Sequence, residues 1–333
     1  MRAYFHSESR VFHVAKIIVT FGVPAEGFRA LRGHELHIPP AGESFSREEL
    51  LSLLGDADAV LACTAFDREL IEAGRTLKLI VCYGAGYDNI DVQAATECGV
   101  PVANTPDSVT ASTAELAIAL MLSLARRVAE LNTRMHNADP QTLFGMGKHM
   151  GCTLEGSTLG IVGMGRIGGK VADIAHALGM RVLYTAHAPK AARESLGDQY
   201  VSLERLMEES DFVSLHCPHT AQTHNLISRE MIALMKPTAF LINTARGPVV
   251  DEQALVEALQ QRRIAGAALD VFTGEPAVNP ALCRLENVIL TPHIGSNTLY
   301  TRNQMAEAAS ERILDALAGR RPQNVVNPQV YAG

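Results

Sequence analysis

Short apolar runs alternate with segments of helical periodicity along most of this 333-residue chain. Runs of three to five mainly apolar residues predict buried strands, and the helical segments between them predict parallel connections. The predicted strands span residues 16–20, 59–63, 79–83, 159–162, 181–184, 212–215, 239–243, 267–269 and 288–290. This alternation is typical of an α/β protein built on parallel sheets.

Several helices can be placed from their ends. Ser46 can cap a helix that runs to residue 54, because Glu49 stands three residues on and can reach back to it. A last amphipathic helix is predicted at 301–318, where a glycine follows it. The most apolar stretch, residues 114–125, predicts a buried helix and is too short to cross a bilayer.

A glycine motif follows directly on the predicted strand at 159–162. Gly163, Gly165 and Gly168 form Gly-x-Gly-x-x-Gly between an apolar strand and an apolar-periodic helix. In a dinucleotide site the first glycine allows a tight turn, and the second lets the backbone approach a pyrophosphate. The third lets the helix pack close to the strand. The helix N-terminus would face the anion with free N–H groups, so the sequence predicts a bound dinucleotide.

The chain is long for one hydrophobic core, and only its second α/β unit carries the complete glycine motif. We therefore predict a Rossmann-type doubly wound parallel-sheet domain, residues 106–297, that binds the dinucleotide. It would be inserted into a smaller flavodoxin-like α/β domain, residues 1–105 with 298–333, that binds the substrate.

The composition of the chain disfavours some classes of binding partner and indicates a cellular compartment. The net charge of −7 disfavours nucleic acid and anionic membranes, so local groups must hold any anionic ligand. Six scattered cysteines without a Cys-x-x-Cys pair favour reduced thiols. Residues 1–13 read as a polar extension that lacks the apolar core of a secretory signal, and we expect a cytoplasmic protein.

The strand at 181–184 runs into Thr185-Ala186-His187, with Lys190 nearby, and has no Asp or Glu at its tip. That carboxylate would bind the adenosine ribose hydroxyls of NAD. Its loss removes repulsion against a 2′-phosphate, and His187 and Lys190 add positive charge. We therefore expect NADP(H) to be favoured over NAD(H). The alternative is that Thr185 and water bind the ribose of NAD.

Arg246, Glu275 and His293 stand beside Gly or Pro turns after predicted strands, where open α/β sheets place their chemistry. A guanidinium can grip a carboxylate and polarise the neighbouring carbonyl. An imidazole can exchange a proton near neutral pH, and a carboxylate on its far nitrogen would orient the ring and favour its protonated form. Together they can hold an anionic ligand and exchange a proton beside the predicted dinucleotide.

These segments together resemble the D-isomer-specific 2-hydroxyacid dehydrogenases, over nearly all of the chain from Lys16. Within that family the sequence is most similar to the glyoxylate/hydroxypyruvate reductases, whose strand tip also lacks the acidic residue. The resemblance implies NAD(P)H-dependent reduction of a small 2-oxo acid to a D-2-hydroxy acid. It is carried by residues 83–91, 160–168, 216–218, 243–247, 270–276 and 291–296.

The resemblance assigns roles to individual residues. Arg246, Glu275 and His293 match the catalytic trio. Ala85 and Gly86 match the loop whose N–H groups hold the substrate carboxylate, with Arg246 and His293 as the other substrate contacts. The cofactor positions match Gly163, Gly165, Arg166, Ile167, Gly168, Ala186, His187, Cys217, Pro218, Thr244, Ala245, Asp270, Gly295 and Ser296.

Alternatives from other classes stay open. A dinucleotide-sensing binding protein, such as a transcriptional corepressor, shares the fold and the trio, but we expect none of its partner-binding tails. Dehydrogenases of the same superfamily acting on phosphoglycerate, D-lactate, phosphite or formate are further candidates, although formate enzymes usually carry Gln where Glu275 stands. His216, His219 and His224 cluster without a matching carboxylate or cysteine, so we expect no metal site.

The apolar helix at 114–125 and the arm after it predict a homodimer. Family resemblance implies that an aromatic side chain from the neighbouring subunit covers the substrate. The chain has no Trp, and Phe144 in the arm at 135–150 is the candidate.

Overall fold

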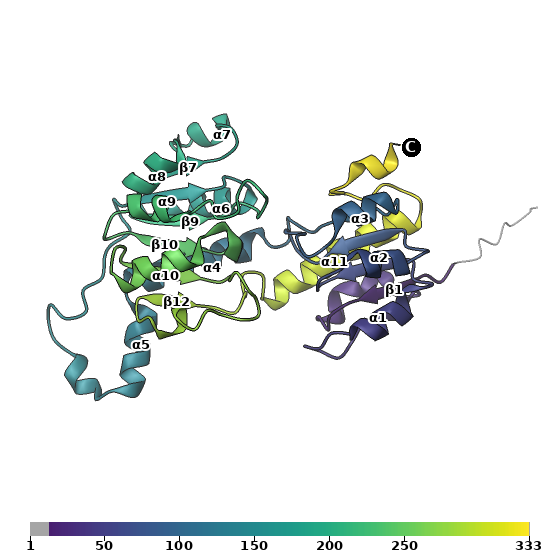
Figure 1. Cartoon of the computed structure of the whole chain (residues 1–333), viewed down its shortest axis with the longest axis horizontal. Coiled ribbons are helices and arrows are strands. Elements are labelled where there is room, and N and C mark those ends of the chain that lie inside the picture. Colours follow the sequence, from purple (N-terminus) through teal and green to yellow (C-terminus); the bar gives the residue numbers. More distant parts are fainter. Residues whose placement is uncertain (1–12, 333) are drawn as a thin grey trace, which may run out of the picture. The chain divides into compact units, whose positions relative to one another are not determined.

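The computed structural model describes residues 13–332 and divides into two compact units. The flanking unit consists of Met1–Ser108 together with Leu299–Gly333, and the central unit is Val109–Thr298. Both units are layered α/β structures (Figure 1). Most of the extension expected at residues 1–13, namely residues 1–12, lies outside the described residues.

The flanking unit holds a parallel sheet in the order β2-β1-β3-β4-β5. Helices α1, α2 and α3 pack on one face, and η1 and α11 lie together on the other. This strand order is flavodoxin-like, as predicted. The strands are β1 (Lys16–Val19), β2 (Glu35–His37), β3 (Ala59–Ala62), β4 (Leu79–Cys82) and β5 (Val102–Ala103). The helices are η1 (Ala25–Leu31), α1 (Arg47–Leu54), α2 (Arg68–Ala73), α3 (Val92–Glu97), α11 (Leu299–Leu317) and η5 (Pro328–Tyr331).

The central unit holds a parallel sheet in the order β12-β11-β10-β9-β6-β7-β8. Helices α4 and α6 cover one face, and α8, α9 and α10 cover the other, which confirms the predicted doubly wound fold. All five residues of β6 are buried, as expected for a parallel strand covered on both faces. The strands are β6 (Thr158–Val162), β7 (Arg181–Thr185), β8 (Gln199–Tyr200), β9 (Phe212–Leu215), β10 (Phe240–Asn243), β11 (Gly266–Leu269) and β12 (Val288–Leu290).

The helices of the central unit vary widely in length. They are α4 (Thr110–Ala125), α5 (Val128–Asn137), η2 (Pro140–Leu143), α6 (Arg166–Ala177), α7 (Ala191–Glu194), α8 (Leu203–Glu209), α9 (Arg229–Leu234), η3 (Gly247–Val249), α10 (Glu252–Gln260) and η4 (Leu282–Arg284). No helix in the described part of the chain is both long and apolar enough to cross a bilayer.

Each predicted strand matches an observed strand to within one residue at either end. The short strands β2, β5 and β8 were not predicted, because two or three residues are too few to carry a periodic pattern. The capping box is confirmed: the Ser46 hydroxyl accepts from the Glu49 N–H, and the Glu49 carboxylate accepts from the Ser46 N–H.

Helix α4 corrects the prediction of a buried helix in two ways. It begins at Thr110, before the predicted start, and it is buried around most of its circumference but leaves one stripe exposed. Ala111, Glu115, Ala119 and Leu122 are exposed. Their spacing of four, four and three residues places them along a single helix face. An apolar helix with one exposed, weakly polar stripe is suited to a protein contact.

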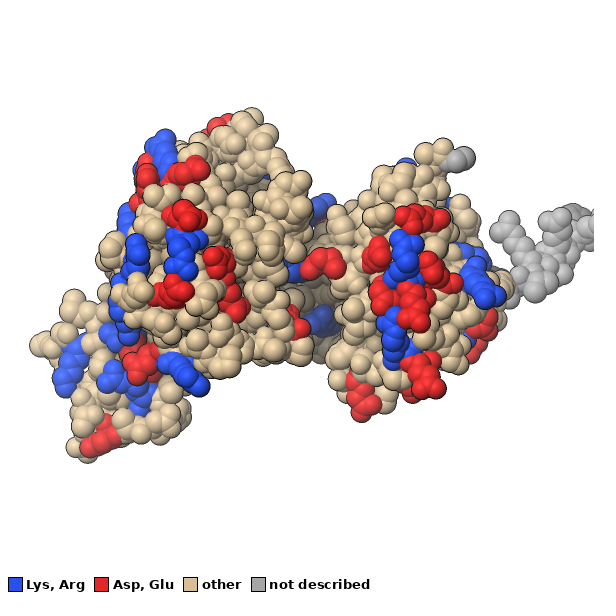
Figure 2. All heavy atoms as spheres, in the orientation of Figure 1, with Lys and Arg blue, Asp and Glu red and all other residues tan. Residues whose placement is uncertain are grey.

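Acidic and basic side chains are interspersed on the face shown in Figure 2. Some of them form ion pairs, such as Arg47 with Asp67 and Arg68 with Glu97. Mixed charge of this kind does not form the basic stripe that binds nucleic acid.

Candidate active site

The glycine motif joins β6 to α6 with the geometry that pyrophosphate binding requires. Gly163 has a φ of 98°, and a Cβ there would lie 2.6 Å from the backbone nitrogen of Cys217. A Cβ on Gly168 would lie 2.3 Å from the carbonyl oxygen of Gly163. Gly165 caps α6, and a Cβ there would meet no atom of the described chain within 4 Å. The N-terminus of α6 is therefore open to a phosphate.

This turn lies where the sheet reverses its strand order. Strands β7 and β8 extend the sheet on one side of β6, and β9 to β12 extend it on the other. The backbone N–H of His216 donates to the Val162 carbonyl at 2.8 Å. The next residue, Cys217, therefore lies beside the glycine turn. Open α/β sheets bind ligands in this crevice. At the same edge, after β10, the Thr244 hydroxyl is buried without a hydrogen-bond partner among residues 13–332. These residues fit a nicotinamide dinucleotide.

Two tyrosines hold the ends of the loop after β7, residues 186–190. Tyr200 donates its hydroxyl to the Ala186 carbonyl at 3.2 Å, and the Tyr184 hydroxyl accepts from the Lys190 N–H at 2.7 Å. Their rings are in contact, with centroids 5.5 Å apart. His187 is exposed between these anchors. Sequence reasoning missed this tyrosine-anchored loop, because the Tyr200 contact depends on how β8 pairs with β7.

Arg246 follows β10 in a loop that Asn243 braces. The Asn243 side chain accepts from the Ala245 N–H at 3.0 Å and donates to the Arg246 carbonyl at 2.9 Å. Arg246 Nη1 donates to the Ala245 carbonyl at 2.8 Å. A Cβ on Gly247 would lie 2.0 Å from the carbonyl carbon of Phe272. The Arg246 loop therefore packs directly on the loop after β11.

Asp270 follows β11 and is 1% exposed. Its Oδ1 accepts from the Thr291 hydroxyl at 2.6 Å and the Ile294 N–H at 2.8 Å, and its Oδ2 accepts from the Gly295 N–H at 2.9 Å. Its carbonyl accepts from the His293 N–H at 3.0 Å. The carboxylate thus supports the turn that carries His293. Direct contact of Asp270 or Gly295 with the cofactor stays a prediction.

His293 and Glu275 form a hydrogen-bonded pair. His293 Nδ1 lies 2.7 Å from Glu275 Oε2, while Glu275 Oε1 accepts from the Phe272 N–H at 2.8 Å. The His293 backbone has a φ of 51°, which is uncommon for a non-glycine residue. The hydrogen bonds to Asp270 hold this conformation. The His293 side chain is 48% exposed, so solvent and ligands can reach the ring.

The pKa of Glu275 shows the charge balance at this site. Burial would raise this pKa, but the hydrogen bonds from His293 and Phe272 and the charge of Arg246 lower it by more. The pKa therefore lies below the ordinary value for Glu, and the side chain is a carboxylate at neutral pH. Arg246, Glu275 and His293, predicted from separate segments, are thus gathered in one electrostatic site of the central unit.

Ala85 and Gly86 lie in the flanking unit, in the loop after β4. The Ala85 carbonyl accepts from the Asn104 side chain at 2.7 Å, and the Gly86 carbonyl accepts from the Cys82 thiol at 3.0 Å. The N–H groups of Ala85 and Gly86 have no acceptor within the described chain. Since the carbonyls face the protein and the N–H groups are available, the loop can bind a carboxylate. Asn104, which sequence reasoning missed, helps to orient it.

His216 is held in its neutral form beneath the crevice. Its Nε2 lies 2.9 Å from the Ser214 hydroxyl, and its Nδ1 is buried without a partner among the described residues. Burial lowers the pKa of His216 to about 4. The nearby His219 and His224 contact each other at the surface. No group of three metal-binding side chains gathers anywhere in residues 13–332.

The remaining predicted cofactor residues stand at the same edges. Arg166 is the first residue of α6, and Ile167 packs against the core beside it. Burial raises the pKa of the Cys217 thiol to about 11, so it acts as a neutral packing group. Pro218 is exposed, and Ser296 is half-buried in the His293 turn.

Comparison with known proteins agrees with this site. Residues 118–295 match the family model for the D-isomer specific 2-hydroxyacid dehydrogenase, NAD binding domain. The glyoxylate reductase of Thermococcus litoralis is 41% identical over 95% of this chain and 97% of its own length. A crystal structure of a glyoxylate reductase from Paecilomyes thermophila has a TM-score of 0.83 at 33% identity, covering 95% of this chain and 99% of that one.

A third relative was solved with ligands. It is the NADPH-dependent glyoxylate/hydroxypyruvate reductase of Sinorhizobium meliloti in complex with NADP and malonate. It has a TM-score of 0.83 at 29% identity and covers 94% of this chain and 97% of its own.

The fold and the site define an oxidoreductase that acts on CH–OH groups with a nicotinamide dinucleotide. The chain belongs to the D-isomer-specific 2-hydroxyacid dehydrogenase family and is related to the glyoxylate reductases. The family and enzyme class predicted from the sequence are thereby confirmed.

Proposed function

We propose that this protein reduces glyoxylate and hydroxypyruvate to their 2-hydroxy acids, with D configuration where the product is chiral, and that NADPH is its preferred reductant. The observation that carries the proposal is the 2.7 Å hydrogen bond between His293 and Glu275, at the sheet edge that also holds Arg246. Two relatives of this chain, from Thermococcus litoralis and Paecilomyes thermophila, are named glyoxylate reductases.

The cofactor, when bound, supplies hydride to the carbonyl carbon of the substrate. Gly163, Gly165 and Gly168 would hold its pyrophosphate, and Thr244 would contact its nicotinamide half with the buried hydroxyl. The carbonyl oxygen then needs a proton. His293 supplies it as the general acid and, in the oxidative direction, takes it back as the general base.

Glu275 acts through His293. Its carboxylate is hydrogen-bonded to Nδ1 and fixes the ring orientation. Arg246 grips the substrate carboxylate with its guanidinium fork and polarises the adjacent carbonyl, a task that a lysine ammonium performs less well. In the flanking unit, the N–H groups of Ala85 and Gly86 are the further contacts that we propose for the substrate carboxylate.

The preference for NADPH rests on the tyrosine-anchored loop. This loop offers His187 and Lys190 and has no carboxylate at the tip of β7. A 2′-phosphate would therefore meet positive charge and no repulsion. The Sinorhizobium relative, solved with NADP, supports the same assignment.

A homodimer in the cytoplasm is also proposed. The exposed stripe of α4 and the segment after it carry apolar side chains that a second subunit would cover. They are Leu122, Val128, Met135, Phe144, Met146 and Met150. Phe144 is the proposed aromatic cover for the partner's substrate. All six cysteines are free thiols, in keeping with a reducing compartment. Light scattering on the purified protein measures the subunit number directly.

One assay tests the function. Cofactor absorbance is followed with glyoxylate, hydroxypyruvate, pyruvate and phenylpyruvate, each with NADPH and with NADH. The proposal expects glyoxylate and hydroxypyruvate to be reduced fastest, with NADPH ahead of NADH. Turnover of none of the four would instead favour a dinucleotide-sensing protein, and turnover with NADH alone would overturn the role given to His187 and Lys190.

A further inference from the structure

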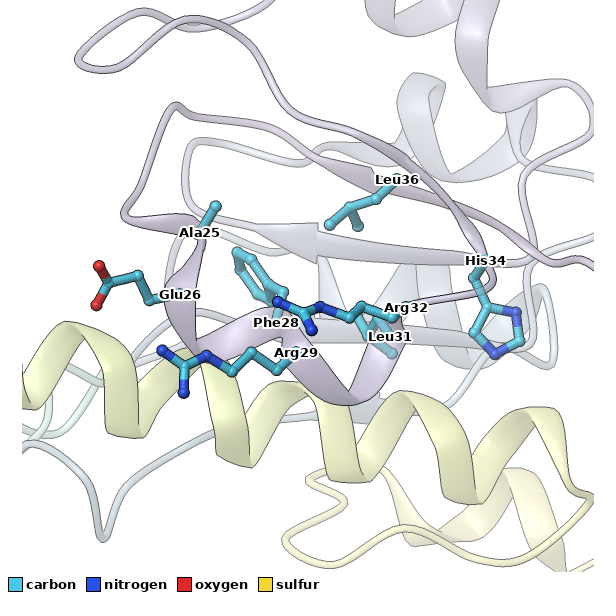
Figure 3. A pocket seen from close by; sticks show the side chains of 8 residues that line it. All are labelled: Ala25, Glu26, Phe28, Arg29, Leu31, Arg32, His34 and Leu36. Atoms are coloured by element: carbon cyan, nitrogen blue, oxygen red, sulfur yellow. The ribbon is translucent and has the colours of Figure 1, made fainter.

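A cavity of about 450 Å³ lies in the flanking unit between η1 and β2 (Figure 3). This volume falls within the range of roughly 300–1,000 Å³ that is usual for small-molecule sites. None of the residues given a role above lines it. Its charged and polar lining comes from Glu26, Arg29, Arg32 and His34.

Arg29 and Arg32 bring two guanidinium groups to this cavity. Both residues are exposed, and neither side chain forms an ion pair or hydrogen bond with any of residues 13–332. Among other exposed arginines of the same unit, Arg47 and Arg68 are paired with carboxylates, whereas Arg75 also forms no ion pair in the described chain. Although the whole chain has a net charge of −7, this concave surface carries two guanidinium groups that no carboxylate of the described chain neutralises.

His34 adds a third donor. Its Nδ1 accepts a hydrogen bond from the Ala15 N–H at 3.2 Å. The ring proton must therefore be on Nε2, which makes that nitrogen a donor even in the neutral imidazole. The polar lining thus consists mainly of donors and positive charge, which suits an anion.

The rest of the lining is apolar. Phe28 and Leu31 are 4% and 2% exposed, and Leu36 of β2 is half-buried beside them. Phe28 and Leu31 are already covered by the protein, so the open apolar part of the lining is Ala25, which is exposed, and Leu36. A bare inorganic ion would leave Ala25 and Leu36 uncovered, whereas a ligand with a small apolar body would contact them. We propose that the cavity binds a small organic anion, in which a carboxylate or phosphate is attached to a compact apolar group.

This site is separate from the substrate loop. In the sheet, β1 and β3 stand between β2 and β4, which is a separation of roughly 14 Å at the usual strand spacing. A ligand beside η1 therefore does not compete with the groups at Ala85 and Gly86. Because the inference rests on the flanking unit alone, it does not depend on the proposed function.

Neutralising Glu26 should change the affinity for an anion in the direction opposite to neutralising Arg29 and Arg32. Its carboxylate lines the cavity, and Asn303 donates to it at 3.4 Å. An anion is attracted by the two guanidinium groups and repelled by this carboxylate. Neutralising Arg29 and Arg32 must weaken binding, while neutralising Glu26 must strengthen it. A general loss of structure cannot produce both results.

The experiment is titration calorimetry on the full chain with phenyl phosphate and, in parallel, benzoate. Every sample carries Arg246→Gln, so that the candidate active site cannot hold the probe through that guanidinium. The variants added to this background are R29Q/R32Q, E26Q and the control R75Q. Arg75 is an exposed arginine outside the cavity that forms no ion pair in the described chain. Inorganic phosphate and phenol serve as probes that lack one half of the ligand.

We expect R29Q/R32Q to weaken the binding of at least one organic anion by about tenfold or more, E26Q to strengthen it by about threefold, and R75Q to leave it unchanged. The probe that binds more tightly identifies the anionic group. Inorganic phosphate and phenol should each bind more weakly than the organic anion. Equal affinity in R29Q/R32Q and R75Q, or no binding of either organic anion, overturns the proposal. If the double variant does not fold, a loss of affinity in E26Q overturns it and a gain supports it.

Discussion

His293 Nδ1 lies 2.7 Å from Glu275 Oε2, and this hydrogen bond joins the loops that follow the neighbouring strands β12 and β11. Because Nδ1 is engaged by a carboxylate, the proton-transfer task falls to Nε2 on the other side of the ring. Asp270 holds the backbone of the same turn through its carboxylate and carbonyl. One acidic residue thus fixes the backbone, and the other fixes the imidazole.

Glu275→Gln keeps a hydrogen-bond acceptor for the ring but removes its charge. We expect glyoxylate turnover to fall by roughly ten- to a hundredfold. The measurement is kcat across about pH 5 to pH 9.

The sign of the wild-type pH dependence follows from the lowered pKa of Glu275. A carboxyl whose folded pKa is depressed stabilises the fold at neutral pH and loses that contribution as the pH falls through its folded value. The pair should therefore stay intact over the assay range. Glu257→Gln, which removes a surface carboxylate paired with Arg229, is the matched control. Equal turnover in Glu275→Gln and Glu257→Gln would rule out the role of Glu275.

Gly168 of the glycine motif and the next residue, Gly169, are expected to respond to alanine substitution in opposite ways. A Cβ on Gly168 would lie 2.3 Å from the Gly163 carbonyl oxygen, whereas a Cβ on Gly169 would meet no atom of the described chain within 4 Å. Gly168→Ala should raise the KM for NADPH and lower the melting temperature. Gly169→Ala should stabilise the protein by about 0.5–1 kcal/mol, since alanine is the better helix former. Thermal unfolding and cofactor titration of the pair check this, and equal effects would contradict it.

Sequence patterns located most of the sheets and the candidate trio, because both are written in short local segments. The strands of the central unit are continuous apolar runs, and the glycine motif and the segments around Arg246, Glu275 and His293 each follow such a run. The supporting contacts could not be predicted. Asp270 acts on the neighbouring loop that carries His293, and Tyr200 reaches Ala186 only through the pairing of β7 with β8. Such contacts depend on packing between segments.

Tyr200→Phe tests the anchored loop. Removing the hydroxyl frees the Ala186 carbonyl and leaves the ring contact with Tyr184 in place. We expect the ratio of the KM for NADPH to the KM for NADH to rise by roughly three- to tenfold, with kcat unchanged. Tyr331→Phe, in the flanking unit, is the control. If both KM values rise by the same factor, the hydroxyl has only a structural role.

The lowered pKa of His216 should make the stability of the fold depend on pH. Its folded pKa of about 4 lies below the unfolded value of about 6.5, so the unfolded chain binds the extra proton between them. Stability is therefore greatest above the unfolded value and is lost as the pH falls from about 6.5 towards about 4. His216→Gln should remove up to about one proton from the uptake on unfolding near pH 5.

Denaturant titrations at several pH values measure this uptake as the slope of the unfolding free energy against pH. His136→Gln, which changes an exposed histidine at the end of α5, provides the comparison. The prediction fails if His216→Gln and the wild type have the same slope.

The most direct test of the proposed chemistry pairs two measurements on His293→Gln: glyoxylate-dependent oxidation of NADPH, and NADPH affinity from the fluorescence of the bound cofactor. We predict that the wild type oxidises NADPH with glyoxylate and that the variant loses roughly 10³-fold in kcat while its NADPH affinity stays within about threefold of the wild type. A variant that binds NADPH normally and reduces glyoxylate at the wild-type rate would contradict the assignment of His293 as the proton donor.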